Sequence, residues 1–243
     1  MFPGIGTVIN VGAIVLGSIF GKLSGNLIPE RTRILITEIL GAITLVSAAS
    51  SLRSLWNEDF VNNTPQGAPI LIVLGSLIFG ALIGSALNLE QRLIGLGESL
   101  KRKFRSEVNT FVDGFVTASL VFAIGPLAIL GSISDGMNTG IDQLLLKSTL
   151  DFFASVAFAA AFGWGVIVSA LPVGVYQSIW TILGLGLGNI LNESQVAAMT
   201  SVGGILLIGI GFKLLNIKEI AVANLLPALF IAPLITSILI KLT

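Results

Sequence analysis

The feature that most constrains the fold of this chain is a stretch of about 40 residues, between Asp151 and Glu193, that holds no charged side chain. A helix crosses the hydrocarbon core of a bilayer with about 20 apolar residues, so the stretch is long enough for two crossings. No polar loop divides it, and Gly163-Trp164-Gly165 predicts a tight turn between the two helices. The sequence therefore predicts an integral membrane protein.

Composition supports the same class. Of the 243 residues, 54% are hydrophobic and 11% are charged, whereas soluble domains carry about 25% charged residues. We predict an all-α fold, a polytopic bundle of about eight transmembrane helices that forms a single transmembrane domain over residues 1–243. The first cation, Lys22, follows the first apolar run, which indicates a retained helix and not a cleaved signal peptide. The helices are predicted at Gly4–Gly21, Arg33–Leu55, Pro69–Leu89, Asn109–Gly131, Asp142–Phe162, Gly165–Gly188, Val196–Leu215 and Lys218–Ile240.

Several kinds of chemistry are excluded by composition. The chain has no cysteine and no histidine, which removes disulfides, imidazole acid–base catalysis and His/Cys metal sites. Its formal net charge of +0 gives no electrostatic reason to bind nucleic acid. No Gly-x-x-x-x-Gly-Lys-Ser/Thr loop for nucleotide phosphates occurs. We therefore expect no enzyme, no catalytic residue, no bound metal and no cofactor, and any work would draw on an ion or solute gradient.

The distribution of cations predicts the orientation. Most of the 13 Lys and Arg residues fall in three segments, Lys22–Arg33, Arg92–Arg105 and Lys213–Lys218. Eight crossings place all three segments on one side of the membrane, and such cation-rich loops are cytoplasmic. Both termini are then predicted to be extracytoplasmic.

The segment that holds Arg92–Arg105 has a helical pattern of its own. Leu93, Leu96, Leu100 and Phe104 recur at helical spacing among cations. The pattern is typical of an amphipathic helix on the inner leaflet, held partly by anionic lipid. A solvated cytoplasmic helix whose charges set the topology is the alternative.

Two internal similarities predict inverted repeats. Six residues of helices one and two recur 163 positions later in helices six and seven: Gly21, Gly25, Asn26, Glu30, Thr37 and Gly41. A second similarity, with an offset of 38, pairs helix four with helix five through Asp113 and Asp151. Both offsets span an odd number of crossings, so the copies would face opposite ways, as in many transporters. Chance matches are the alternative, because Gly and small apolar residues are abundant.

The strongest candidate for a functional residue is Asp151. It lies about nine residues into helix five, which is about 13 Å along the helix axis, and ionisable groups at such depth are costly. Lys147 lies one turn earlier on the same face. Asp151 could receive a cation or a proton, with Lys147 as the competing counter-charge. Alternatively, the two side chains form a pair that only neutralises itself.

Further candidates for an ion or substrate site come from the neighbouring helices. Asp113 matches Asp151 in the second repeat, so the two carboxylates could converge on one axis and favour proton coupling. Gly125 and Pro126 predict a break in helix four, in the same segment as Asp135. A broken helix could offer carbonyls to a cation or its N-terminus to an anion, or it could be an ordinary proline kink.

Three more polar residues are predicted to lie in the membrane: Asn10, Glu38 and Gln177. Asn10 is expected to form hydrogen bonds between helices, and Gln177 follows a second proline kink at Pro172. The glycine series Gly17/Gly21/Gly25 predicts a face for close helix packing, which could also serve a homodimer.

Three stretches resemble a known family. Residues 117–136, Leu146-Lys-Ser-Thr-Leu-Asp151 and Gly174-Val-Tyr-Gln177 are similar to the YqgA/YdfK-type bacterial inner-membrane proteins, a family of unknown function. The resemblance covers essentially the whole chain. It implies a plasma membrane location in a bacterium or archaeon, and it names no substrate.

The sequence thus predicts a gradient-driven transporter or channel for an ion or small polar solute, with its site where helices four and five meet. A non-transporting membrane scaffold or accessory protein is the alternative, and an intramembrane enzyme that uses Asp, Glu, Ser and Lys alone is disfavoured. The expected partners are the lipid bilayer, a small solute or ion and, through the glycine faces, a second copy.

Overall fold

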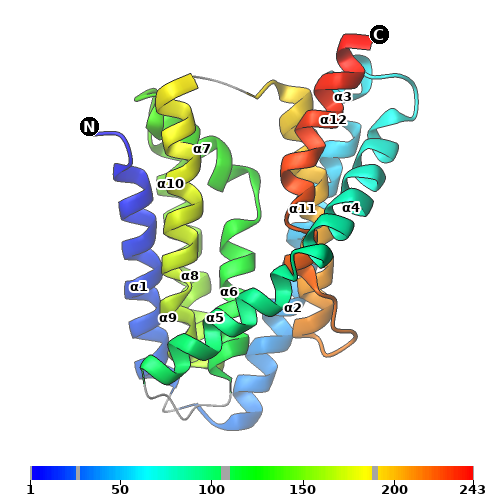
Figure 1. Ribbon diagram of the computed structural model, residues 1–243. Helices are drawn as coiled ribbons and strands as arrows, with labels where there is room; N and C mark the ends of the chain where they lie inside the picture. Colours follow the sequence, from blue (N-terminus) through cyan, green and yellow to red (C-terminus); the bar gives the residue numbers. More distant parts are fainter. Residues whose placement is uncertain (1, 26–27, 105–109, 188–190, 243) are drawn as a thin grey trace. The chain divides into compact units, whose positions relative to one another are not determined.

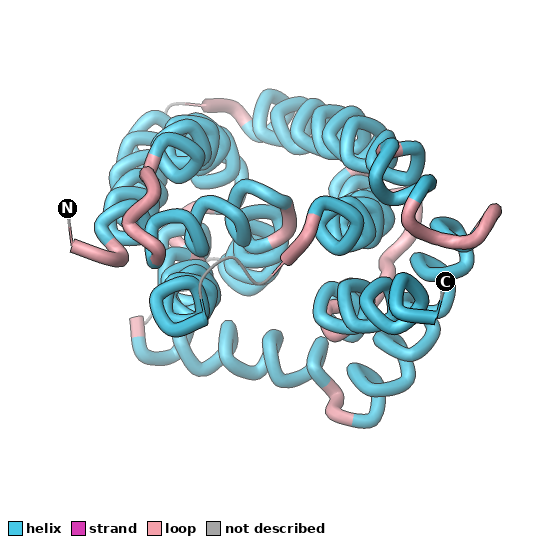
Figure 2. The backbone as a smooth tube through the Cα atoms, turned by 90° about the horizontal axis from the view of Figure 1, so that it is seen from above, coloured by secondary structure: helices cyan, strands magenta, loops and turns pink. Residues whose placement is uncertain are grey.

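The computed structural model of the chain describes residues 2–25, 28–104, 110–187 and 191–242 (Figure 1). All regular structure in this part of the chain is helical (Figure 2), as the sequence predicted. The elements are α1 (Ile5–Gly25), α2 (Glu30–Leu52), η1 (Arg53–Trp56), α3 (Glu58–Asn62), α4 (Ala68–Ala86), α5 (Leu89–Lys103), α6 (Phe111–Ala123), α7 (Pro126–Gly136), α8 (Asp142–Phe162), α9 (Gly165–Val168), α10 (Ala170–Leu187), α11 (Glu193–Leu214), η2 (Val222–Leu225) and α12 (Ala228–Leu242).

The helices agree closely with the predicted crossings. Within the described residues, seven segments are long and apolar enough to span a membrane, and the bent pair of α6 and α7 makes an eighth if it counts as one. Helix α8 begins and ends at the predicted residues. The predicted turn follows it at Gly163, whose φ of 81° lies in the region that favours glycine. Because a tight turn replaces a polar loop there, two crossings fit into one uncharged stretch.

The chain forms two compact units, and the single transmembrane domain stays a prediction. Unit 1 comprises residues 1–40 and 93–190, and unit 2 comprises residues 41–92 and 191–243. Each unit is therefore made of two separate stretches of the chain. The predicted site residues all lie in unit 1.

In unit 1, α1 packs closely along α8. A Cβ atom at Gly17, Gly21 or Gly25 would meet the backbone of Phe152, Val156 or Ala160, respectively. The absence of side chains at these glycines lets the two backbones approach, which confirms the predicted packing face. The contacts rise together in residue number, so α1 and α8 are parallel.

Parallel packing of α1 and α8 bears on the number of crossings. If α1, α2 and α4 are the first three crossings, a parallel α8 must be the fifth. The bent pair of α6 and α7 then counts as the fourth crossing, despite its bend of 63°. Had this pair turned back on itself, α8 would be the fourth crossing and would run against α1.

The helices of the first predicted repeat run in opposite directions. In unit 1, α1 and α10 lie side by side (Figure 1). Thr7 contacts Thr181 and Asn10 contacts Gln177, so residue numbers rise in one helix as they fall in the other. In unit 2, the second half of α2 runs against α11, because Gly41 meets Leu214 whereas Ala48 meets Gly204. An inverted repeat requires these directions, but neighbouring helices of any up-and-down bundle also have them, so the repeat stays a prediction.

Unit 2 corrects one predicted boundary. The predicted helix Lys218–Ile240 is wrong at its start, because α12 begins only at Ala228 and η2 precedes it. Pro227, directly before α12, lacks the N–H group that a continuous helix would need at this position. The preceding segment is held by Glu90, whose carboxylate accepts from the Ala223 N–H at 2.8 Å and whose N–H donates to Asn224 at 2.9 Å.

The predicted amphipathic helix is α5. Gly97, in its middle, is buried against the Phe115 ring, whereas Leu96 and Phe104 are exposed. The helical interpretation of this loop is therefore confirmed. Contact of its exposed apolar side chains with lipid stays a prediction.

Candidate functional site

A buried polar cluster joins three helices of unit 1. The Asp151 cluster, as we call it, consists of Asn10 on α1, Lys147 and Asp151 on α8, and Gln177 on α10. Lys147 Nζ donates to Asp151 Oδ2 at 2.7 Å, and Asn10 Nδ2 donates to the same oxygen at 3.0 Å. Asn10 Nδ2 also lies 3.3 Å from Gln177 Oε1. Four predicted site residues are thus brought into one network.

Burial makes this cluster costly. Asn10 and Gln177 are completely buried, and Lys147 and Asp151 are each 6% exposed. The i,i+4 spacing on α8 places the ammonium beside the carboxylate, so each charge is neutralised locally. Removing either partner would leave an uncompensated charge inside the protein, which is strongly destabilising.

The network also fixes how the two amide groups are oriented. Asn10 must present its NH₂ group to Asp151, because its carbonyl oxygen would be repelled there. Gln177 must present its carbonyl oxygen to that NH₂ group, because two NH₂ groups would repel each other. These orientations leave the Asn10 Oδ1 acceptor and the Gln177 Nε2 donor buried, and neither has a hydrogen-bond partner among the described residues. Such unfilled buried groups are rare in native proteins and mark sites that require an explanation.

Asp135 lies one helical turn from this cluster. Its carboxylate accepts a hydrogen bond from the Gly6 N–H at 3.0 Å, in the first turn of α1, and the residue is 2% exposed. The positive end of the α1 dipole stabilises a carboxylate in this position. Gly6 and Asn10 are four residues apart, so the Asp135 contact lies about 6 Å along α1 from the Asp151 cluster.

Hydroxyl groups extend the polar region in both directions along α1. Between Gly6 and Asn10, Thr7 Oγ1 lies 3.4 Å from Thr181 Oγ1. Two turns beyond Asn10, Ser18 and Ser155 are buried, and neither hydroxyl has a partner among the described residues. From residue 6 to residue 18 this polar track covers about 18 Å of α1, at a rise of 1.5 Å per residue.

Beyond Ser18 the polar track ends. Gly21 and Gly25 pack directly on the α8 backbone at Val156 and Ala160. These contacts leave no room for a side chain between the two helices. The track is therefore closed toward the C-terminal end of α1.

The structure does not bring Asp113 to Asp151. Asp113 is exposed in the first turn of α6, and its neighbour Gly114 packs against Phe162 at the end of α8. Asp151 and Phe162 are 11 residues apart, which is about 16 Å along α8. Glu38 is likewise exposed on α2 and does not belong to the cluster.

The predicted helix break at Gly125 and Pro126 is present. Helix α6 ends at Ala123 and α7 begins at Pro126, with Gly125 between them at a φ of 141°. Phe122, just before the break, packs its ring on Phe158, seven residues beyond Asp151. The break turns α7 so that Asp135 reaches the start of α1.

The hydroxyl groups of the polar track were missed at the sequence level. Single Ser and Thr residues are common in apolar helices, where they usually bond to their own backbone, as Ser148 does to the Leu144 carbonyl at 2.6 Å. One signal was available, because Ser155 follows Asp151 by four residues and so shares its face of the helix.

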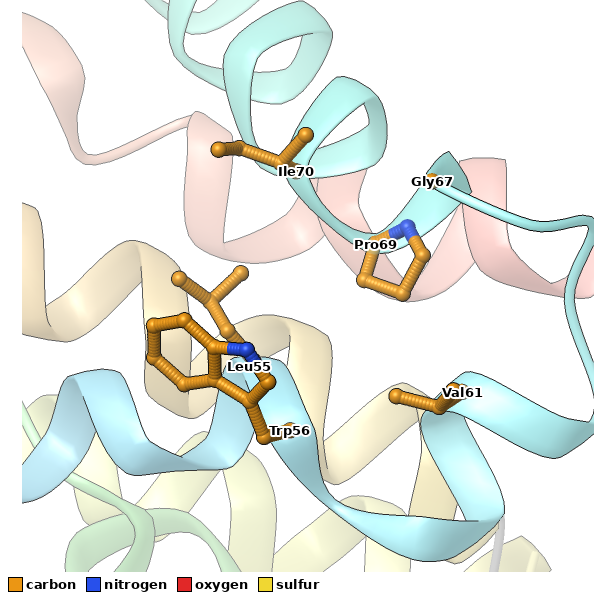
Figure 3. Close-up of a pocket in the computed structure, with 6 residues that line it drawn as sticks. All are labelled: Leu55, Trp56, Val61, Gly67, Pro69 and Ile70. Atoms are coloured by element: carbon orange, nitrogen blue, oxygen red, sulfur yellow. The ribbon is translucent and has the colours of Figure 1, made fainter.

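A separate apolar pocket of about 300 Å³ lies in unit 2 (Figure 3). It opens at the connection between α2 and α4, where Trp56 is 74% exposed. Its lining carries no ionisable side chain, and an exposed Trp is typical of the membrane–water interface. We therefore place the candidate site in the Asp151 cluster. The pocket is lined by Leu55, Trp56, Val61, Gly67, Pro69 and Ile70.

Comparison with known proteins agrees with the assignment to the membrane. A family model described as "Protein of unknown function (DUF554)" matches residues 5–237. The chain belongs to this family. It is 30% identical over 239 residues to the uncharacterized protein YqgA of Escherichia coli (strain K12), covering 94% of each chain. It is 28% identical over 230 residues to the uncharacterized membrane protein YdfK of Bacillus subtilis (strain 168), covering 95% of this chain and 94% of YdfK.

No solved structure matches the chain. The DUF554 protein described here is an integral membrane protein, and the resemblance inferred from its sequence is confirmed. The family supplies no activity, so a function must be argued from the cluster itself.

Proposed function

We propose that this DUF554 protein is a gradient-driven transporter for an ion or a small polar solute. The observation that carries the proposal is the buried Asp151 cluster, with its unfilled Asn10 Oδ1 and Gln177 Nε2. Ionisable groups inside membrane helices are costly and mark substrate or ion pathways. A ligand that fills the two open hydrogen-bonding positions would account for both.

The closed end of the polar track favours a transporter over an open channel. A channel needs a continuous polar route, whereas Gly21 and Gly25 seal α1 against α8. Release of a ligand on that side would require α1 and α8 to separate there. Such alternating access is the usual mechanism of secondary transporters.

Orientation and location follow from the cation distribution and the family resemblance. In this proposal the protein lies in the plasma membrane of a bacterium or archaeon, with both termini outside the cytoplasm. The start of α1, with Asp135 beside it, then faces outward, and the Gly21–Gly25 contact faces the cytoplasm. In this orientation the end of the polar track that the glycine contacts close would face the cytoplasm.

The alternative function is a non-transporting scaffold or accessory protein. Lys147 and Asp151 already neutralise each other, and a pair of this kind can serve only to fix how helices pack. Homodimerisation also stays a prediction. Gly17, Gly21 and Gly25 do not support it, because they are occupied by packing inside unit 1.

Flux into proteoliposomes separates the two functions. The purified full chain would be reconstituted and assayed with a panel of alkali cations, anions and amino acids. We expect flux of at least one solute, and its loss in the Asp151→Asn variant. Asp142→Asn, the same change at an exposed position of α8, is the matched control and should retain flux. Absence of flux for every solute in the unaltered protein would favour the scaffold.

A further inference from the structure

The ionisable side chains buried in the polar track of unit 1 do not balance in charge. They are the carboxylates of Asp135 and Asp151 and the ammonium of Lys147, all at least nine-tenths buried. Lys147 is paired with Asp151, and no cationic side chain among the described residues forms a salt bridge with Asp135. Counted as two carboxylates and one ammonium, these side chains have a formal net charge of −1.

The start of α1 offsets only part of this charge. A helix N-terminus acts as roughly half of a positive charge, and Asp135 receives one hydrogen bond there, from the Gly6 N–H. Charge buried without a counter-charge is costly in a medium of low dielectric constant. The site is thus short of positive charge by about half a unit or more.

A second observation indicates what kind of ligand the site would take. Asn10 Oδ1 is a completely buried acceptor without a partner among the described residues, and it lies one helical turn from Gly6. Around the same turn of α1 are the Thr7 and Thr181 hydroxyls. Asn10 Oδ1 thus shares one stretch of α1 with carboxylate and hydroxyl oxygens, and hard cations take oxygen ligands.

We propose that this site binds one monovalent metal cation, Na⁺ or K⁺, between Asp135 and Asp151, with Asn10 Oδ1 as a neutral ligand. The inference rests on the proposed transport function and names the ion that is carried or coupled. One positive charge balances the buried side chains, whereas a divalent ion would overcompensate them. A proton would neutralise a carboxylate but would leave Asn10 Oδ1 unfilled. The Gln177 Nε2 donor would be met by a water molecule that the cation holds.

The order of the ligands defines a route. A cation that enters at the start of α1 meets Asp135 first and reaches Asp151 about 6 Å further along the helix. Lys147 already occupies Asp151 Oδ2, so the arriving cation competes with the ammonium for that carboxylate. This competition keeps binding reversible, which transport requires.

The test measures cation binding without relying on flux. Thermal unfolding of the full chain in detergent would be followed by the fluorescence of its three Trp residues. NaCl, KCl or N-methyl-D-glucamine chloride would be titrated at constant ionic strength and pH. A ligand that binds only the folded state raises the unfolding midpoint in a saturable way. We expect such a rise with Na⁺ or K⁺ and none with N-methyl-D-glucamine.

Asp135→Asn is the decisive variant. The amide oxygen can still accept from the Gly6 N–H, but the negative charge is lost. We expect the half-saturating cation concentration to rise at least about tenfold, which corresponds to the loss of one charged ligand contact. The exposed Asp142→Asn change should leave it unaltered. If Asp135→Asn does not fold, binding of radioactive ²²Na⁺ to the unaltered protein, displaced by K⁺, decides the same question.

Several results would overturn the inference. They are a midpoint that responds to pH and not to Na⁺ or K⁺, a response only to Mg²⁺ or Ca²⁺, and an Asp135→Asn variant that binds cations like the unaltered protein. Failure of the proposed function looks different: saturable cation binding without flux of any solute would refute transport and retain the site. Solute flux that is equal in N-methyl-D-glucamine medium would retain transport and refute the cation.

Discussion

Asn10 Nδ2 lies 3.0 Å from Asp151 Oδ2 and so connects two residues 141 positions apart in the chain. The contact is possible because α1 and α8 run parallel and the glycines of α1 allow the two backbones to approach closely. A single amide group therefore links the ion pair on α8 to Gln177 on α10. Three membrane helices meet at one polar point.

We predict that losing one member of the ion pair on α8 destabilises the protein more than losing both. Asp151→Ala should lower the free energy of unfolding by about 3–5 kcal/mol, because it leaves the Lys147 ammonium buried without a counter-charge. Replacing both residues, Lys147→Met with Asp151→Leu, should cost much less than the single change. Unfolding in a denaturing detergent measures both variants.

The exposed Thr149→Ala change on the same helix is the control for this comparison and should be nearly silent. A double variant as unstable as the sum of its two single variants would contradict the prediction. It would show that Lys147 and Asp151 act independently. In either result, the double variant should be inactive in flux if the cluster is the transport site.

Gln177 separates a binding role from a structural one. Its Nε2 has no partner among the described residues, so Gln177→Leu removes only the weak contact with Asn10. We expect the stability to change by less than about 1 kcal/mol, as is usual for hydrogen bonds between membrane helices. Solute flux should fall at least tenfold if this donor meets a ligand or its water.

Gln143→Leu, an exposed change near the start of α8, is the matched control for Gln177→Leu. Normal flux in a stable Gln177→Leu variant would remove Gln177 from the binding site. A large loss of stability would instead show that its hydrogen bond to Asn10 is structural.

The glycine contact between α1 and α8 should not tolerate a side chain. Gly21→Val would place its Cβ against the Val156 carbonyl, and overpacking of this kind costs about 1–3 kcal/mol. Gly12→Val on the same helix is the control, because a Cβ there meets no atom within 4 Å. The midpoint of thermal unfolding measures the difference, and equal midpoints would refute the close packing.

The sequence predicts helices well here because long apolar runs have few alternatives in a bilayer. Both ends of α8 were predicted correctly, and the turn at Gly163 was predicted because no polar loop occurs there. The prediction failed at the start of α12, where apolar residues continue through η2 and only Pro227 marks the boundary. Apolarity alone does not distinguish a crossing helix from an irregular apolar segment.

The candidate site was predicted only in part, because local contacts follow from the sequence whereas contacts between helices do not. Lys147 and Asp151 are four residues apart on one helix, so local geometry predicts their contact. The pairing of Asp135 with the start of α1 depends on the 63° bend between α6 and α7, which brings α7 to another helix. Asp113 was grouped with Asp151 from a sequence similarity, but α6 runs against α8 and places Asp113 near the far end of it. Contacts between helices need their directions and packing, which sequence patterns do not specify.

The number of crossings can be tested by cysteine labelling, since the chain has no natural cysteine. Single changes at exposed positions would be labelled with a membrane-impermeant maleimide in intact cells. Eight crossings place Ser99 and Glu219 on the cytoplasmic side and Gln66 and Asp142 on the outer side. We therefore expect labelling of Gln66→Cys and Asp142→Cys in intact cells, and of the other two only after the membrane is opened.

Asp142 is the informative position because it follows the bent pair of α6 and α7. If that pair crosses the membrane, Asp142 lies on the side opposite to Ser99, and α8 runs parallel to α1, as their glycine contacts require. If the pair turns back, Asp142→Cys shares the accessibility of Ser99→Cys and α8 runs the other way. Protection of both positions in intact cells would therefore contradict the parallel packing of α1 and α8, and with it the contact between Asn10 and Asp151.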